Sequence, residues 1–361
     1  MVQGGVEKHC EELCPRLAKL GCEVAVATRS PYIPKERRLK EWRGTKFIHL
    51  WAPRQRNFEA IIHSVLATII ARLKSPDILH IHAVGPSLVT PLAKILGLKV
   101  VMTHHGPDYE RKKWGKVAKM ALRAGEFLGV NFAEKTIAIS HTIKSEVEKK
   151  YSRKYPVCIP NGVNLPKILP PGETLRKYGL KKKRYIFTAC RFVPEKGLHD
   201  LISAYQKINN PEYSLVIAGD ADHETDYRRG IKSKAKENKR IVLTGFLFGS
   251  SLQELYSNAG LFVLPSYFEG LPITLLEAMS FGLPVLVSDI PQLREVKLPE
   301  YRYFPVGNSD KLAEKIEELM RRQISEEEKE TQFRILKENY DWDNIASKTL
   351  AVYKSCLKKS A

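Results

Sequence analysis

The stretch Phe268 to Pro284, FEGLPITLLEAMSFGLP, decides the fold that we expect for this chain of 361 residues. It follows an apolar run, Leu261 to Pro265, that is typical of a buried parallel strand. A loop then leads into a helical pattern from Ile273 to Phe281, which Gly282 and Pro284 end. The stretch therefore predicts a strand, a loop and a helix of an α/β domain.

Two glutamates flank the start of this predicted helix. Glu269 comes at the carboxyl end of the strand, and Glu277 lies one turn inside the helix. Between them, the backbone amides of a helix amino terminus carry a partial positive charge and unpaired N–H groups, which suit a phosphate. A carboxylate on each side could hold hydroxyl groups. A sugar nucleotide has both kinds of group: a diphosphate for the amides and hydroxyls for the carboxylates. An ordinary strand–loop–helix unit with one solvated and one capping glutamate would explain the same stretch.

The spacing of the two glutamates, followed by a glycine–proline break, resembles the retaining glycosyltransferases of the GT-B fold. More narrowly, it is similar to family four, the glycogen-synthase-like group. The resemblance implies an α/β fold of GT-B architecture, with two doubly wound, Rossmann-like domains facing each other across a cleft. It also implies transfer of a sugar from a nucleoside-diphosphate-sugar donor to an acceptor, with retention of the anomeric configuration and with no metal and no other cofactor.

The length of the chain suits two domains. We place the first at residues 1–165 and the nucleotide-sugar-binding second domain at 166–342, because an N-G-V motif and a proline-rich stretch meet near residue 165. By resemblance, a last helix of about residues 343–361 crosses back to the first domain.

The first domain begins with Gly4 and Gly5, which open an amphipathic helix. The family carries a similar G-G-x-E motif that faces the donor diphosphate. Three residues precede the motif here, so the first strand is missing: either the start of the chain was assigned too late, or the amino-terminal sheet lacks its usual central strand.

A pair of histidines, His104 and His105, follows the predicted strand Val100 to Thr103. Adjacent side chains on an extended backbone point in opposite directions, so one of the two is expected to face the ligand. In the family, a histidine after such a strand is oriented towards the donor sugar. We assign this role to His105, with His104 as the second choice.

Arg191 and Lys196 lie on the loop after the predicted strand Tyr185 to Cys190. Two cations at this spacing can converge on a diphosphate. Arg191 can bind it with two hydrogen bonds from its guanidinium, and Lys196 can bind it as a single point charge. They match the family pattern G-R-x-x-x-x-K-G, with Cys190 in place of the glycine.

The resemblance then gives each candidate residue a role. His105, Glu269, Arg191 and Lys196 are the expected catalytic residues. Glu269 would lie over the sugar, Glu277 would bind the ribose hydroxyls, and the backbone near Gly245 would lie against the nucleobase. The expected donor-binding residues are Gly4, Gly5, Arg191, Lys196, Gly245, Glu269, Gly270, Leu271, Ile273, Thr274 and Glu277.

The net charge is +19, with a sequence pI near 9.5, which favours polyanionic partners or, equally, reflects a lysine-rich soluble surface. The basic, amphipathic segment Tyr109 to Lys135 could lie on anionic lipid or pack against its own domain. We expect a nucleotide-sugar donor, a carbohydrate or lipid-linked acceptor and an anionic membrane surface as partners, and no nucleic acid. Because no long apolar run and no secretory signal occur, we expect a cytoplasmic protein, peripheral on the inner face of the cell membrane.

Other functions remain open at this stage. A glycoside hydrolase would use paired carboxylates but would not need the Arg–Lys pair. A nicotinamide dehydrogenase needs a G-x-G-x-x-G motif after a strand, which the chain does not have. A GT-B epimerase is the nearest rival, and a basic polyanion- or nucleic-acid-binding protein would explain the charge. We interpret Asp220 and Asp222 as turn and helix-start residues rather than as a metal site.

Overall fold

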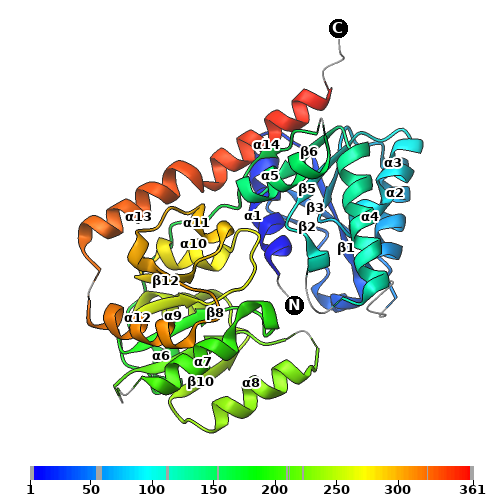
Figure 1. The fold of residues 1–361 in the computed structure, drawn as a ribbon. Coiled ribbons are helices and arrows are strands. Elements are labelled where there is room, and N and C mark those ends of the chain that lie inside the picture. The colour runs from blue at the N-terminus through cyan, green and yellow to red at the C-terminus, as the bar shows by residue number, and fades with distance from the viewer. Residues whose placement is uncertain are drawn as a thin grey trace. The chain divides into compact units, whose positions relative to one another are not determined.

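The structure, a computed structural model, describes residues 4–53, 59–110, 114–152, 154–208, 210, 212–221, 223–322 and 324–357. The chain divides into two compact units (Figure 1). Unit 1 consists of Met1–Asn161 with Trp342–Ala361, and unit 2 consists of Gly162–Asp341. The sequence analysis placed the corresponding changes of domain near residues 165 and 343.

Unit 1 alternates strands with helices. Its helices are α1 (Gly5–Lys19), α2 (Glu59–Lys74), α3 (Thr90–Ile95), α4 (Lys116–Phe132), α5 (His141–Lys150) and α14 (Trp342–Leu357). Its strands are β1 (Val24–Arg29), β2 (Glu41–Trp42), β3 (Thr45–Leu50), β4 (Leu79–His82), β5 (Val100–His104), β6 (Lys135–Ala138) and β7 (Val157–Cys158). Single 3-10 turns cover Ser30–Tyr32, Lys35–Arg37, Pro86–Val89 and Asp108–Glu110.

The strands of unit 1 form two sheets rather than one. A three-stranded sheet has the order β1-β3-β2, and a parallel four-stranded sheet has the order β4-β5-β6-β7. Among the described residues, no strand joins β1 to β4.

Helices cover both faces of the four-stranded sheet. Successive residues of a strand point to opposite faces, so neighbouring residues of β5 pack against different helices. Val101 packs with Leu13 of α1 and Trp342 of α14 in one buried cluster. Its neighbour Val100 packs in a second cluster with Ala93 of α3. The helices α1 and α14, at opposite ends of the chain, therefore share one face of this sheet.

Unit 2 is built around a six-stranded parallel sheet with the order β10-β9-β8-β11-β12-β13. The strands are β8 (Tyr185–Ala189), β9 (Ser214–Ala218), β10 (Ile241–Gly245), β11 (Leu261–Leu264), β12 (Val285–Ser288) and β13 (Tyr303–Phe304). The helices are α6 (Glu173–Lys177), α7 (Leu198–Lys207), α8 (Asp226–Lys236), α9 (Gly249–Asn258), α10 (Ile273–Ser280), α11 (Pro291–Arg294), α12 (Ser309–Arg321) and α13 (Glu326–Asn339). The 3-10 turns are Pro194–Lys196 and Glu300–Arg302.

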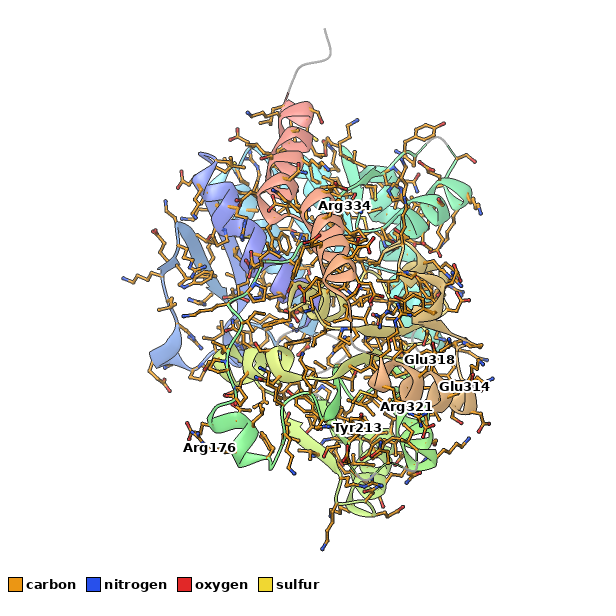
Figure 2. All side chains as sticks on the ribbon, turned by 90° about the vertical axis from the view of Figure 1, so that its left-hand side faces the viewer. Arg176, Tyr213, Glu314, Glu318, Arg321 and Arg334 are labelled. Carbon is orange, nitrogen blue, oxygen red and sulfur yellow. The ribbon has the colours of Figure 1, made fainter. Side chains whose placement is uncertain are left out.

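Apolar residues face inward on the helices of unit 2. On α12, Ile316 and Leu319 are buried in the core cluster, whereas Glu314, Glu318 and Arg321 are exposed. Figure 2 labels these three charged side chains together with Arg176, Tyr213 and Arg334. On the other side of the sheet, the buried rings of Phe187 and Tyr256 meet edge to face, with centroids 4.9 Å apart.

Both connections between the units run side by side. The Val163 N–H donates to the carbonyl of Tyr340 at 2.8 Å, and Val163 forms a parallel bridge with Asp341. The N-G-V motif is therefore paired with the break between α13 and α14.

Candidate functional site

The candidate site of unit 2 begins at Glu269, in the loop between β11 and α10. Its side chain is 6% exposed. Ser266 Oγ donates to Glu269 Oε1 at 2.6 Å, and Lys196 Nζ donates to the two carboxylate oxygens at 2.6 and 2.7 Å. A buried carboxylate requires partners of this kind because leaving it unpaired costs several kcal/mol, on the order of the desolvation penalty for one ion.

Lys196 reaches Glu269 because β8 and β11 are neighbours in the sheet. Both side chains follow the carboxyl ends of these parallel strands, where α/β sheets bind their ligands. The loops are in close contact: Gly197 has φ +62°, and a Cβ there would lie 1.9 Å from the carbonyl oxygen of Pro265. A glycine is therefore required at position 197 to bring Lys196 to Glu269.

Arg191 is half-buried on the same loop as Lys196. The preceding Cys190 replaces the glycine of the family pattern. Its backbone does not have a positive φ, and its side chain packs against the core, so position 190 does not need a glycine. Burial raises the pKa of the Cys190 thiol to about 12, although Lys196 and Arg191 act in the opposite direction.

Helix α10 starts four residues after Glu269, at Ile273. In the first turn of any helix, amides such as those of Ile273 and Thr274 have no acceptor within the helix. One turn further, Glu277 is half-buried and accepts a hydrogen bond from Tyr256 Oη at 3.2 Å. Burial, and then the Glu277 carboxylate, raise the pKa of Tyr256 well above its ordinary value, so Tyr256 remains a donor.

The remaining predicted residues of unit 2 lie at the same edge of its sheet. Gly245 ends β10 with φ +70°, and Gly270 and Leu271 lie in the loop after Glu269. Asp220, after β9, binds Arg228 at 2.7 and 2.9 Å and Lys232 at 3.1 Å. Asp220 Oδ1 also accepts from the Ala221 amide at 2.8 Å, whereas Thr225 caps the start of α8, so Asp220 is not a helix-start residue. Asp222 lies outside the described residues.

The two histidines after β5 have different surroundings. His104 is buried, with Nε2 at 2.9 Å from Glu126 Oε1 of α4. Glu126 also accepts from Tyr151 Oη at 2.6 Å and from Lys150. Burial alone would raise the pKa of Glu126, but the hydrogen bonds from His104, Lys150 and Tyr151 lower it to about 2. His104 therefore belongs to a buried network that the sequence analysis did not identify.

His105 instead lies among other histidines. Its Nε2 is 3.1 Å from His82 Nδ1, and its ring lies edge-on to that of His9, with centroids 5.0 Å apart. His9 is on α1, whose amino terminus is formed by Gly4 and Gly5. The Gly4 N–H donates to Glu7 Oε2 at 3.0 Å. The structure thus brings the helix opened by the two glycines together with His105.

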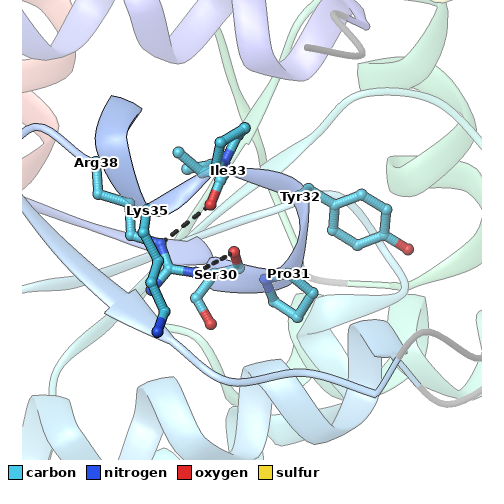
Figure 3. A pocket seen from close by; sticks show the side chains of 7 residues that line it. Ser30, Pro31, Tyr32, Ile33, Lys35 and Arg38 are labelled. Atoms are coloured by element: carbon cyan, nitrogen blue, oxygen red, sulfur yellow. Dashed lines mark hydrogen bonds between the residues drawn. The ribbon is translucent and has the colours of Figure 1, made fainter.

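A pocket elsewhere in unit 1 contains none of these residues. It is lined by Ser30, Pro31, Tyr32, Ile33, Pro34, Lys35 and Arg38 (Figure 3). The Arg38 guanidinium donates to the carbonyls of Ser30 and Ile33 at 2.8 and 3.0 Å, which closes the turn on itself.

Comparison with known proteins gives matches to both units. Residues 3–167 match the family model described as Glycosyltransferase Family 4, and residues 173–339 match the one described as Glycosyl transferases group 1. An uncharacterized glycosyltransferase of Methanocaldococcus jannaschii is 27% identical over 380 residues, covering 99% of this chain and 96% of the relative.

Two further proteins have more specific descriptions. The UDP-Gal:alpha-D-GlcNAc-diphosphoundecaprenol alpha-1,3-galactosyltransferase of Escherichia coli is 31% identical over 228 residues, which are 59% of this chain and 58% of the relative. The crystal structure of HepE from Anabaena in complex with UDP-glucose superimposes with a TM-score of 0.80 at 18% identity, covering 98% of this chain and 97% of that one.

Proposed function

Because the chain belongs to the family-four glycosyltransferases and has their GT-B fold, we propose that it transfers a sugar from a nucleoside-diphosphate-sugar donor to a lipid-linked or cell-surface saccharide precursor, with retention and without a metal. The donor site rests on one observation: Lys196 Nζ donates to both oxygens of the buried Glu269 carboxylate, in the loop that leads into the amino terminus of α10. This arrangement combines a cation and helix amides for phosphates with a carboxylate for hydroxyls.

In the proposed reaction, the bond between the anomeric carbon and the diphosphate oxygen breaks, and the acceptor oxygen forms the new bond on the same face of the sugar. Lys196 and Arg191 neutralise the charge that develops on the departing diphosphate, so a metal is not needed for that task. The acceptor proton passes to an oxygen of the leaving phosphate. Glu269 binds the sugar and stabilises positive charge at the anomeric carbon, and Glu277 binds the ribose.

Within this proposal we assign His105 to the donor sugar and the backbone at Gly4 and Gly5 to the diphosphate. The engagement of both ring nitrogens of His104 supports the choice of His105: Nε2 lies 2.9 Å from Glu126 Oε1, and Nδ1 accepts from the Gly106 amide at 3.1 Å. Gly245 provides backbone for the nucleobase.

The lipid-linked acceptor is supported by the outer surface of α4. Val117, Met120 and Phe127 recur at helical spacing on this helix and are 76, 67 and 50% exposed. Lys116 and Arg123, also exposed, lie at one edge of this apolar stripe. A stripe of this kind suits the surface of an anionic bilayer, with the apolar side chains among the lipids and the cations at the headgroups. Among the described residues, no helix has the length and apolarity needed to cross a membrane.

We expect Met120→Glu to weaken binding to vesicles that contain anionic lipid by about tenfold or more, because it removes an apolar contact and adds a repelled charge. Co-sedimentation with anionic and with neutral vesicles measures this. Leu165→Glu, at an exposed apolar position of unit 2, is the matched control and should bind like the wild type. Equal binding by Met120→Glu and the wild type would remove α4 from the proposed membrane contact.

The function itself is tested by incubating the protein with a panel of nucleoside-diphosphate sugars and lipid-linked saccharide acceptors, in EDTA. We expect one donor to release its nucleoside diphosphate only when an acceptor is present, with the donor's anomeric configuration retained in the product by NMR. Epimerised donor without a transfer product, or cleavage of glycosides without a donor, would contradict the proposal.

A further inference from the structure

Three histidines of unit 1 come together from three separate elements. His9 lies on the second turn of α1, His82 ends β4, and His105 directly follows β5. The strands β4 and β5 are parallel neighbours, and His82 is in register with Thr103. One ring nitrogen from each histidine lies within 4.8 Å of the corresponding nitrogens of the other two.

This spacing suits metal coordination. With Zn–N bonds of about 2.0–2.1 Å in a tetrahedron, two ligand nitrogens lie ~3.4 Å apart. His82 Nδ1 and His105 Nε2 are 3.1 Å apart, close to this separation, and a ring nitrogen of His9 lies within 4.8 Å of a ring nitrogen of each. We propose that His9, His82 and His105 form a binding site for a divalent transition-metal ion of the zinc class, with a solvent or ligand oxygen as the fourth ligand.

The surroundings of His9 hold its ring in a suitable tautomer. His9 Nδ1 is 2.9 Å from Asn161 Oδ1, and an amide oxygen can only accept a hydrogen bond. The proton is therefore on Nδ1, which leaves a lone pair on Nε2 for a metal. Histidine ligands in metal sites usually have a second hydrogen bond of this kind. The Trp342 ring, with its centroid 5.5 Å from that of His9, packs against the same imidazole.

A fourth histidine, His80, adjoins the cluster but is fully engaged. Its Nδ1 is 2.6 Å from Tyr353 Oη and its Nε2 is 2.7 Å from Thr103 Oγ1. Its ring packs against that of His82, with centroids 4.1 Å apart. Both of its nitrogens are already hydrogen-bonded, so His80 is not counted among the metal ligands. The three-histidine set is therefore defined by geometry and not only by the number of histidines nearby.

Because the set has imidazole nitrogens and no carboxylate, it favours Zn²⁺, Co²⁺, Ni²⁺ or Cu²⁺ over Mg²⁺ or Ca²⁺.

The site has a consequence for catalysis that rests on the proposed function. His105 is the residue that we assign to the donor sugar, and a bound metal would occupy its Nε2. The metal is therefore an inhibitor rather than a cofactor: transfer proceeds in EDTA and falls when Zn²⁺ occupies the cluster.

Binding is tested on the purified full-length chain after removal of any affinity tag. Titration with Co²⁺ should give the visible absorption bands of a tetrahedral complex at one equivalent, which Zn²⁺ then displaces. We expect His82→Ala to abolish these bands. Asn161→Ala should weaken Zn²⁺ binding by about 10- to 100-fold, the usual effect of removing the hydrogen bond behind a ligand.

His223→Ala is the matched control, because it removes one exposed histidine from unit 2. It should bind Co²⁺ like the wild type, and thermal unfolding should confirm that His82→Ala remains folded. The absence of a tetrahedral Co²⁺ spectrum in the wild type, or its persistence in folded His82→Ala, would overturn the proposed site.

Inhibition is tested separately. Zn²⁺ should inhibit transfer by the wild type, EDTA should restore it, and the transfer that His82→Ala retains should not be sensitive to Zn²⁺. Binding of Zn²⁺ without inhibition would overturn the inhibitory role. If no donor supports transfer, the proposed function fails, whereas the Co²⁺ spectrum still decides whether the metal site exists.

Discussion

Lys196→Ala is expected to lower sugar-transfer turnover by at least about tenfold, because removing one group that stabilises developing negative charge costs about 10²–10³-fold in kcat. Lys196 is the cation that holds the buried carboxylate of Glu269, and we assign it to the donor diphosphate. Its loss removes the charge on which departure of the diphosphate depends. Initial rates of nucleoside diphosphate release, at saturating donor and acceptor, measure the effect.

Two variants separate this role from a structural one. Lys207→Ala removes a lysine of the same unit that contacts the exposed Asp310, and it should leave turnover unchanged. Lys196→Arg keeps the charge and should recover part of the activity, though not all, because the guanidinium fork has a different geometry. Near-normal turnover by Lys196→Ala would contradict the assignment of the diphosphate site.

The second large effect is expected for Glu269→Gln, which should lower turnover by about 10²-fold or more. Glutamine has nearly the same shape as glutamate and can still accept the hydrogen bond from Ser266 Oγ. It removes the negative charge that we assign to the reacting sugar and that pairs with Lys196. The kcat should fall more than the affinity for the donor changes, because charge stabilisation matters most in the transition state.

Ser266→Ala is the matched control for this carboxylate. It removes one hydrogen bond to Glu269 and leaves the charge and the Lys196 contact in place, so its effect on kcat should be much smaller. If Ser266→Ala loses as much activity as Glu269→Gln, the position of the side chain, and not its charge, would be decisive. A Glu269→Gln variant with wild-type kcat would exclude Glu269 from catalysis.

Much of the local structure could be predicted because its signals are local. The strand expected from Leu261 is β11, and the helix expected from Ile273 is α10, which ends one residue earlier than predicted, at Ser280. In each case an apolar run or a helical period ends at a glycine or a proline.

Other elements were missed for identifiable reasons. The segment before α3 begins as a 3-10 turn, Pro86–Val89, and becomes α-helical only at Thr90, where Pro91 occupies the first turn. The two-residue strand β2 joins β3 through Arg43 and Gly44, which both have positive φ. A glycine between two strand-like segments is a turn signal that could have identified this hairpin.

The contacts that build the sites depend on the order of strands, which the sequence does not contain. Lys196 and Glu269 are 73 positions apart and meet because β8 and β11 are neighbours. Similarly, the carboxylate of Glu254 on α9 accepts from the amides of Gly172 and Leu175 and caps α6. The histidine cluster joins α1, β4 and β5 without a fixed spacing such as H-E-x-x-H, so no sequence motif could have indicated it.

The central claim is that unit 2 binds a nucleoside diphosphate through Lys196, and a thermal-shift panel tests it most directly. The panel contains UDP, GDP, TDP, ADP, CMP and NAD, each measured on the wild type and on Lys196→Ala. A ligand at about a hundred times its dissociation constant adds roughly 2.7 kcal/mol to the free energy of unfolding. We predict that one diphosphate raises the unfolding temperature of the wild type and that Lys196→Ala loses this rise. Equal stabilisation of both proteins, or none by any of the nucleotides, would contradict the claim.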